Sequence, residues 1–422
     1  MTKPLRALVL PLVLLAACAF PAAAAEQGLA AGDLVAICGD SITEQKDYSV
    51  DIEDYLLMCQ PVAKLQAMQF GWGGETSWGF LGRMANDALP FAPQVATTCY
   101  GMNDGGYAPL GADRAKQYHD AQKGIVAAFK KAGTRFIVVG APGCVDADTF
   151  HHSPEQAVMY NKTLAELGAL AKQVADEEGV VFADVHGAMM TAMAKAKEKY
   201  GKEYVFAGGD GVHPGRNGHL VMAYAYLKAL GCDGAIGTVT VDLAAKKAET
   251  TAGHRILAVG ADGAVQVVST RYPFCVSGDP KQQTTASAAE FIPFNQELNR
   301  FLLVVTNPGA ERLAVTWGAA TKEFSAADLA KGINLAAEFG DNPFTPFFLK
   351  VESAVRGQQI YETEFVKNFL HNVPQYRQVI SDEGATWDRL VAKGTAKAVG
   401  LRATASEALV PVTHVITIKA VK

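Results

Sequence analysis

A serine just past the end of an apolar run is the part of this sequence best suited to chemistry. Residues 34–38 are expected to form a buried strand, and Gly39 allows the chain to turn sharply after it. Ser41 would then lie at the carboxyl end of that strand, where open α/β sheets place their sites. A serine hydroxyl is a weak nucleophile unless a base and an anion-stabilising pocket lie beside it. The rest of the chain must therefore supply both.

A histidine three residues after an aspartate is the candidate base. The Asp210 carboxylate can accept the Nδ1 proton of His213, which leaves Nε2 free to take a proton from a serine. Pro214 suits the first turn of a helix, predicted over residues 215–230, so His213 is expected at a helix start. The alternative interpretation is a plain helix cap.

Two glycine-containing segments could supply neutral donors to a substrate oxygen. Within residues 71–76, the Gly74 N–H can approach a ligand closely because glycine has no side chain. Within residues 101–104, Asn103 offers an amide that can stabilise a developing negative charge. Both segments are also favourable turn sequences, which is their structural alternative. The strands expected before them span residues 65–70 and 95–100.

Taken in order, these motifs resemble those of the SGNH hydrolases, also called the GDSL esterase/lipase family. The matching pieces are Gly39-Asp40-Ser41, Gly74, Gly101-x-Asn103-Asp104 and Asp210-x-x-His213, within about residues 33 to 231. Ile42 stands where the family name has leucine, which is a conservative change.

The resemblance implies a role for each matched residue. Ser41 would be the nucleophile, His213 the general base and Asp210 its orienting partner. The oxyanion hole would consist of the Ser41 N–H, the Gly74 N–H and the Asn103 side chain. Asp40 belongs to the motif without a separate chemical step. No cofactor and no metal are implied.

The first half alternates between strand and helix patterns. Helices are predicted over residues 48–58, 78–89, 112–132 and 154–178, and further strands over 136–140 and 180–183. Such alternation favours parallel strands with right-handed crossovers, hence a three-layer α/β/α sandwich, which the resemblance makes flavodoxin-like. The chain lacks the G-x-S-x-G motif of α/β-hydrolases in this region, together with the dinucleotide and P-loop fingerprints.

The pattern changes near residue 233. We expect a hydrolase domain over residues 26–232 and an accessory region over 233–422 that is mainly β with a helical segment at about 344–380. Trp317 and Trp387 could stack on sugars, although core packing is the favoured interpretation.

The amino terminus has the pattern of an export signal. A short basic start, an apolar run and small residues before Glu26 predict a signal peptide over residues 1–25, hence a periplasmic or extracellular protein. Cys18 also fits a lipoprotein signal, in which it would carry a lipid anchor. No membrane span is expected in the mature chain.

Composition fits an enzyme-sized body with sizeable cores. The 422 residues are 49% hydrophobic and carry a formal net charge of −5, and no purely basic patch suggests nucleic-acid binding. Removal of Cys18 would leave six of the seven cysteines, whose pairing the spacing leaves open. The oligomeric state is not indicated.

We therefore predict a secreted serine ester hydrolase that works through an acyl-serine intermediate. Its substrate would be a small-molecule or polysaccharide ester, with a carbohydrate O-acetylesterase favoured by export and the accessory region. A lipase or lysophospholipase of the same family is the nearest alternative. A non-catalytic binding protein of the cell envelope, built on a hydrolase fold, is the alternative from another class. A structural envelope protein recruited through residues 233–422 is a third.

Overall fold

The computed structural model of the protein describes residues 28–421. The predicted signal peptide and Cys18 lie outside the described residues. Within them, no helix is both long and apolar enough to cross a membrane. The six cysteines of the described part are buried and unpaired.

The first part of the described chain is built around a parallel sheet with the strand order β2-β1-β3-β4-β5. The order changes direction between β1 and β3, so their carboxyl ends border the crevice in which doubly wound sheets bind ligands. These strands are β1 (Leu34–Gly39), β2 (Gln66–Gln69), β3 (Val95–Cys99), β4 (Phe136–Gly140) and β5 (Val181–Ala183).

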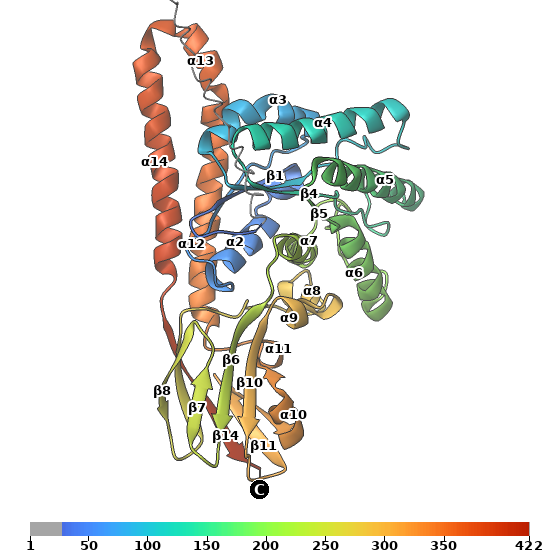
Figure 1. The fold of residues 1–422 in the computed structure, drawn as a ribbon. Coiled ribbons are helices and arrows are strands. Elements are labelled where there is room, and N and C mark those ends of the chain that lie inside the picture. The colour runs from blue at the N-terminus through green and yellow to red at the C-terminus, as the bar shows by residue number, and fades with distance from the viewer. Residues whose placement is uncertain (1–27, 422) are drawn as a thin grey trace, which may run out of the picture.

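Alternating side chains of β1 feed two cores, one on each face of this sheet. Val35 and Ile37 pack into one core, and Ala36 and Cys38 into the other. Helices α3 (Ser77–Asp87), α4 (Ala112–Lys131) and α5 (Pro154–Glu178) cover the face that is uppermost in Figure 1. The opposite side holds α2 (Tyr48–Met58), α6 (Val185–Tyr200) and α7 (Arg216–Ala229). The predicted α/β/α sandwich is confirmed.

A β-sandwich of two sheets follows, in agreement with the prediction of a mainly β second region. One sheet has the order β13-β10-β6-β7 and the other β12-β11-β14-β9-β8. The first consists of β6 (Ala235–Asp242), β7 (Lys247–Thr250), β10 (Arg300–Thr306) and β13 (Ile333–Asn334). The second consists of β8 (His254–Val259), β9 (Ala264–Ser269), β11 (Arg312–Trp317), β12 (Ala320–Ser325) and β14 (Val412–Ala420).

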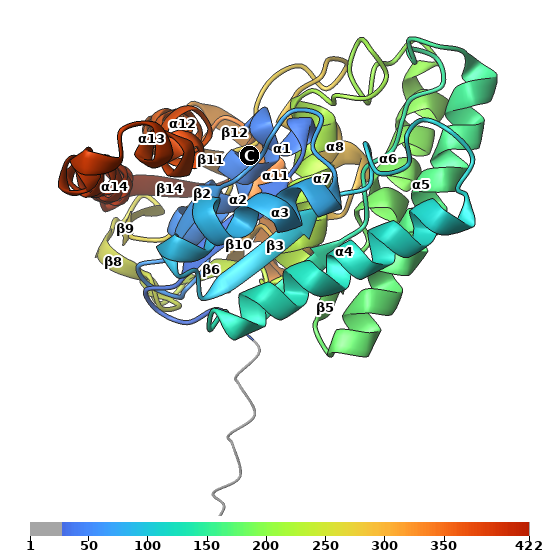
Figure 2. The ribbon, with the colours of Figure 1, turned by 90° about the horizontal axis from the view of Figure 1, so that it is seen from above.

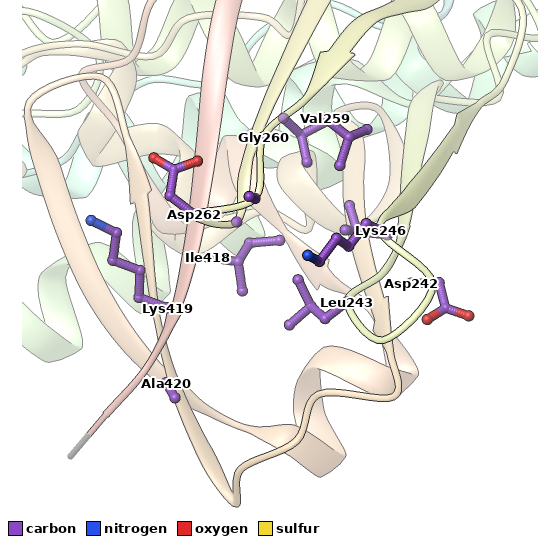
Figure 3. Close-up of a pocket in the computed structure, with 13 residues that line it drawn as sticks. Asp242, Leu243, Lys246, Val259, Gly260, Asp262, Ile418, Lys419 and Ala420 are labelled. Carbon is purple, nitrogen blue, oxygen red and sulfur yellow. The ribbon is translucent and has the colours of Figure 1, made fainter.

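Short helices border the sandwich, and a hollow opens at its outer end. The hollow has a volume of about 300 Å³, and Val259, Leu243 and Ile418 line it (Figure 3). Asp242 and Lys419 point away from it, whereas Lys246 also lines it (Figure 3). The short helices are α8 (Thr285–Phe291), α9 (Phe294–Glu297), α10 (Ala326–Lys331) and α11 (Leu335–Glu338).

A long helical hairpin is inserted between the last two strands of the sandwich, β13 and β14. It consists of α12 (Thr345–Glu364), a π-turn (Phe365–Phe369), a 3₁₀ turn (Leu370–Asn372), α13 (Val373–Val379), a second 3₁₀ turn (Ser381–Glu383) and α14 (Gly384–Ala408). Figures 1 and 2 show it along the β2 side of the molecule, far from α5 and α6. It thereby covers an edge strand that would otherwise be open to pairing. The sequence predicted helix only to about residue 380, because α14 buries few side chains and has a weak apolar stripe.

Buried amides join the hairpin to the first part of the chain. Gln359 accepts the Ser49 hydroxyl at 2.7 Å and donates to Glu53 Oε2 at 2.7 Å. Gln358 donates to Glu53 Oε1 at 2.9 Å. Burial raises the pKa of Glu53, although these amide hydrogen bonds oppose the shift. The hairpin is therefore docked through specific polar contacts as well as through packing.

A directional chain of hydrogen bonds crosses the sandwich core. Trp317 donates its indole N–H to His414 Nδ1 at 3.1 Å, and His414 Nε2 lies 3.0 Å from Ser269 Oγ. Ser269 Oγ lies 2.7 Å from His254 Nδ1, whose Nε2 contacts the Ile236 carbonyl at 3.0 Å. Every donor is matched if both histidines are neutral. Trp317 is fully buried, which excludes sugar stacking by this residue.

Candidate active site

The structure brings Ser41, His213 and Asp210 into one hydrogen-bonded line. Ser41 Oγ lies 2.7 Å from His213 Nε2, and His213 Nδ1 lies 2.7 Å from Asp210 Oδ2. Because Nδ1 donates to the carboxylate, Nε2 is the acceptor for the serine hydroxyl. The serine comes from the end of β1 and the other two from the loop before α7.

Backbone amides hold Asp210 in its orientation. The Val212 and His213 N–H groups both donate to Asp210 Oδ1 at 2.9 Å, which leaves Oδ2 for the imidazole. Partial burial acts to raise the pKa of Asp210, but the hydrogen bonds from His213 and Val212 outweigh it and hold that pKa below its ordinary value. Asp210 is therefore ionised where it meets the histidine.

Ser41 begins the short helix α1 (Ser41–Glu44), and Asp40 caps that helix. Asp40 Oδ1 accepts the Ile42 N–H at 3.0 Å. Burial raises the pKa of Asp40 to about 7. The cap fixes the turn that presents Ser41, which gives the motif aspartate a structural task.

The other two predicted donors lie after the strands on either side of β1. Gly74 follows β2 and has φ +74°, a left-handed conformation that favours glycine. Asn103 follows β3, and its Nδ2 donates to the Glu75 carbonyl at 3.0 Å, so one amide hydrogen remains available. Among residues 28–421, neither the Ser41 N–H nor the Gly74 N–H has a hydrogen-bond partner. Three free donors thus sit in segments that flank or include the serine.

Behind the Gly71–Thr76 loop lies an ion pair that the sequence did not reveal. Arg83 Nε contacts Glu75 Oε1 at 2.6 Å, and Arg83 Nη2 donates to the Phe70 carbonyl at 2.7 Å. Both charged side chains are only 7% exposed. Burial raises the pKa of Glu75 although Arg83 opposes that shift, and the arginine remains charged.

Asp104 fixes the far end of the same loop. Its Oδ1 accepts the Ser77 N–H at 2.8 Å and the Ser77 hydroxyl at 2.5 Å, at the start of α3. Burial raises the pKa of Asp104 to about 6. Asp104 therefore couples the segment of Asn103 to the segment of Gly74.

Half-exposed aromatic rings border this region. Tyr107 stacks on Tyr160 with ring centroids 4.6 Å apart and also meets the buried Phe150. A shallow hollow of about 410 Å³ lies beside the glycine loop, with Trp72 and Arg83 in its lining. His151 contacts the Asp210 carbonyl through Nδ1. These rings could contact a substrate, while the described residues contain no cluster suited to a metal ion.

The arrangement can perform acyl transfer. His213 can accept the Ser41 proton while Asp210 stabilises the imidazolium, and neutral donors are at hand for a tetrahedral oxyanion. Glu75 and Arg83 were not singled out in the sequence, and only their contacts identify them as supports. Asp104 belongs to the matched motif, but no role for it followed from the sequence, and its contact with Ser77 supplies one.

Comparison with known proteins agrees with this chemistry. Residues 37–221 match the model of the GDSL-like lipase/acylhydrolase family. A search of curated proteins finds no match.

Two solved structures can be compared with this chain, and only the first has a TM-score above 0.5. BT4096, a gut microbial diltiazem-metabolizing enzyme, is 20% identical with a TM-score of 0.72, and the match covers 94% of this chain and 99% of that chain. Axe2, an acetylxylan esterase from Geobacillus stearothermophilus, is 19% identical with a TM-score of 0.40, and the match covers 49% of this chain and 97% of that chain. The first likeness shows that the whole architecture, accessory region included, occurs in another protein.

Proposed function

We propose that this ester hydrolase cleaves its substrate through an acyl-serine on Ser41, and the match of residues 37–221 to the GDSL-like lipase/acylhydrolase family supports the proposal. The observation that carries this proposal is the continuous line from Ser41 Oγ through His213 to Asp210, with 2.7 Å at each step.

The proposed reaction has two halves. Ser41 attacks the ester carbonyl as His213 takes its proton, and the oxyanion accepts hydrogen bonds from the Ser41 N–H, the Gly74 N–H and Asn103. His213 then protonates the leaving alcohol. Water, activated by His213, attacks the acyl-serine and releases the acid.

The proposed substrate is an O-acetyl ester of a carbohydrate or a comparable small molecule outside the cytoplasm. The half-exposed rings of Tyr107 and Trp72 support it, because aromatic faces beside a polar site suit sugar rings. The signal pattern of residues 1–25 supports export. Comparing rates on acetylated oligosaccharides and long-chain esters tests this choice, and faster cleavage of long-chain esters would favour a lipase instead.

The nucleophile is tested with a serine-directed phosphonate and a chromogenic acetyl ester. Wild type should be labelled at Ser41 and should hydrolyse the ester. Ser41→Ala should lose both properties while its thermal unfolding is unchanged. Ser381→Ala, at an exposed position in the hairpin, is the matched control and should behave as wild type. Full activity of Ser41→Ala would overturn the assignment.

A further inference from the structure

Residues 365–372 of the inserted hairpin, which we name the brace segment, lie against residues next to the glycine loop of the candidate active site. It contains the π-turn Phe365–Phe369 and the following 3₁₀ turn. Single π-turns occur often at functional sites because the extra residue redirects side chains. Two side chains of this segment, Lys367 and His371, contact Glu44 and Asp87, which are linked through further contacts to the segments of Gly74 and Asn103.

Lys367 is linked to the glycine loop through Glu44. Lys367 Nζ lies 2.6 Å from Glu44 Oε1, and Glu44 Oε2 accepts the Gly73 N–H at 2.5 Å. Glu44 also ends the helix that Ser41 begins. One carboxylate therefore connects the serine helix, the residue before Gly74 and a cation from the accessory region.

His371 is linked to Asn103 through a series of hydrogen bonds and ion pairs. His371 Nδ1 lies 2.8 Å from Asp87 Oδ2, and Asp87 accepts from Arg83 at 3.3 Å. Arg83 holds the Glu75 carboxylate, and the Glu75 carbonyl accepts the Asn103 amide. Asp87 is fully buried, so loss of its hydrogen bond to His371 would leave Asp87 Oδ2 with only the longer bond from Arg83 and would disturb Arg83 and Glu75.

Trp72, two residues before Gly74, lies among these same groups. Lys367 Nζ is 5.0 Å and Arg83 Cζ 4.9 Å from the centre of its ring, and the His371 ring meets it edge-on at 4.8 Å. Cations near an indole face are attracted by its quadrupole. The indole is thus held from the hairpin side and from the α3 side.

A further contact holds the start of the loop. Thr363 of α12 accepts a hydrogen bond from Gln69 Nε2, and Gln69 Oε1 accepts the Gly71 N–H at 2.8 Å. The loop has glycine at 71, 73 and 74, so its own backbone provides little rigidity. The conformation of the glycine loop therefore depends on its contacts with neighbouring side chains.

We propose that the brace segment sets the position of the oxyanion hole, with Lys367 and His371 as positioning residues for ester hydrolysis. The proposal rests on the proposed function, since it concerns Gly74 and Asn103 as donors. Oxyanion donors act at full strength only when they are already placed for the developing charge. The accessory region thereby contributes to turnover without touching the substrate.

The test compares Lys367→Met with Lys350→Met, which changes an exposed lysine of α12. Lys367→Met should lower kcat by about 10- to 100-fold with a small change in KM, because misplaced donors weaken transition-state binding. A boronic acid that forms a tetrahedral serine adduct should bind it more weakly by a similar factor. Lys367→Arg should recover most activity, and Lys350→Met should match wild type.

His371→Phe provides a second and independent variant. It keeps an aromatic ring against Trp72 but removes the hydrogen bond to Asp87, and it should also lower kcat more than it raises KM. This variant decides the question if Lys367→Met does not fold. Folding is checked by thermal unfolding of each variant.

Two kinds of failure remain distinguishable. If wild type neither cleaves esters nor reacts with the phosphonate, the proposed function fails. If wild type is active but folded Lys367→Met and His371→Phe retain its kcat and its boronic acid affinity, only the brace proposal is overturned.

Discussion

The Asn103 side chain donates to the backbone carbonyl of Glu75 at 3.0 Å, across two loops that follow different strands of the sheet. One N–H of the Asn103 side-chain amide is bound to this carbonyl, and that bond fixes the direction of the second N–H. Glu75 is itself held by Arg83, so the amide has a rigid support. A donor of this kind is prepared before substrate arrives.

Replacing Asn103 should therefore reduce turnover. Asn103→Ala is expected to lower kcat by about 10²–10³-fold, as removal of one oxyanion donor does in other acyl-transfer enzymes, with little effect on KM. Steady-state kinetics on an acetyl ester measures both constants. Asn307, an exposed asparagine with φ +48°, provides the control Asn307→Gly, because glycine adopts that conformation without strain. A change confined to KM would contradict a role in the transition state.

Replacing Asp210 by asparagine should impair the histidine without disturbing the loop. The asparagine oxygen can still accept from the Val212 and His213 amides, but its NH₂ group would face Nδ1 and favour the wrong tautomer. We expect kcat/KM to fall by about 10²–10⁴-fold. Asp184→Asn, at an exposed helix cap, is the matched control. Retained kcat/KM in Asp210→Asn would argue against a carboxylate partner for His213.

The buried His414 should make stability depend on pH. Burial lowers its pKa from 6.5 to about 3 in the folded protein. Between those values the unfolded chain binds the extra proton, so the free energy of unfolding should fall as pH decreases from about 6.5 toward 3. The slope from this residue is at most about 1.4 kcal/mol per pH unit. Above pH 6.5 His414 is neutral in the folded and the unfolded protein, so it adds no pH dependence to the free energy of unfolding.

His414→Gln isolates that effect. Glutamine can accept from Trp317 and donate to Ser269 but does not titrate, so its stability should decline less steeply below pH 6.5. Urea unfolding at several pH values measures the difference. Equal slopes for both proteins would show that His414 is not the group responsible.

The docking of the hairpin should depend on Gln359. Gln359→Leu removes the partners of Ser49 and of one Glu53 oxygen while keeping similar volume, and it should destabilise the fold by about 1–3 kcal/mol. The midpoint of urea unfolding measures this loss. Gln375→Leu, at an exposed position of α13, should leave the midpoint nearly unchanged. An unchanged midpoint in Gln359→Leu would mean that packing alone holds α12 in place.

The helices and strands of the first half could be predicted because each follows from local pattern. Predicted helix 48–58 and strand 136–140 agree with α2 and β4 at both ends. Ser41, Gly74 and Asn103 were candidates because each follows a predicted strand of the sheet, and the family resemblance assigned their roles. The accessory strands were also expected, but α14 was not.

By itself, the sequence determined the α/β/α sandwich, the mainly β second region and the short motifs whose residues now lie together. Only the tertiary structure decided that the hairpin interrupts the sandwich, that it covers β2, and that Lys367 meets Glu44. Local patterns report on neighbours along the chain and on faces of single elements. A contact between residues 44 and 367 leaves no such trace, because it depends on how whole elements pack.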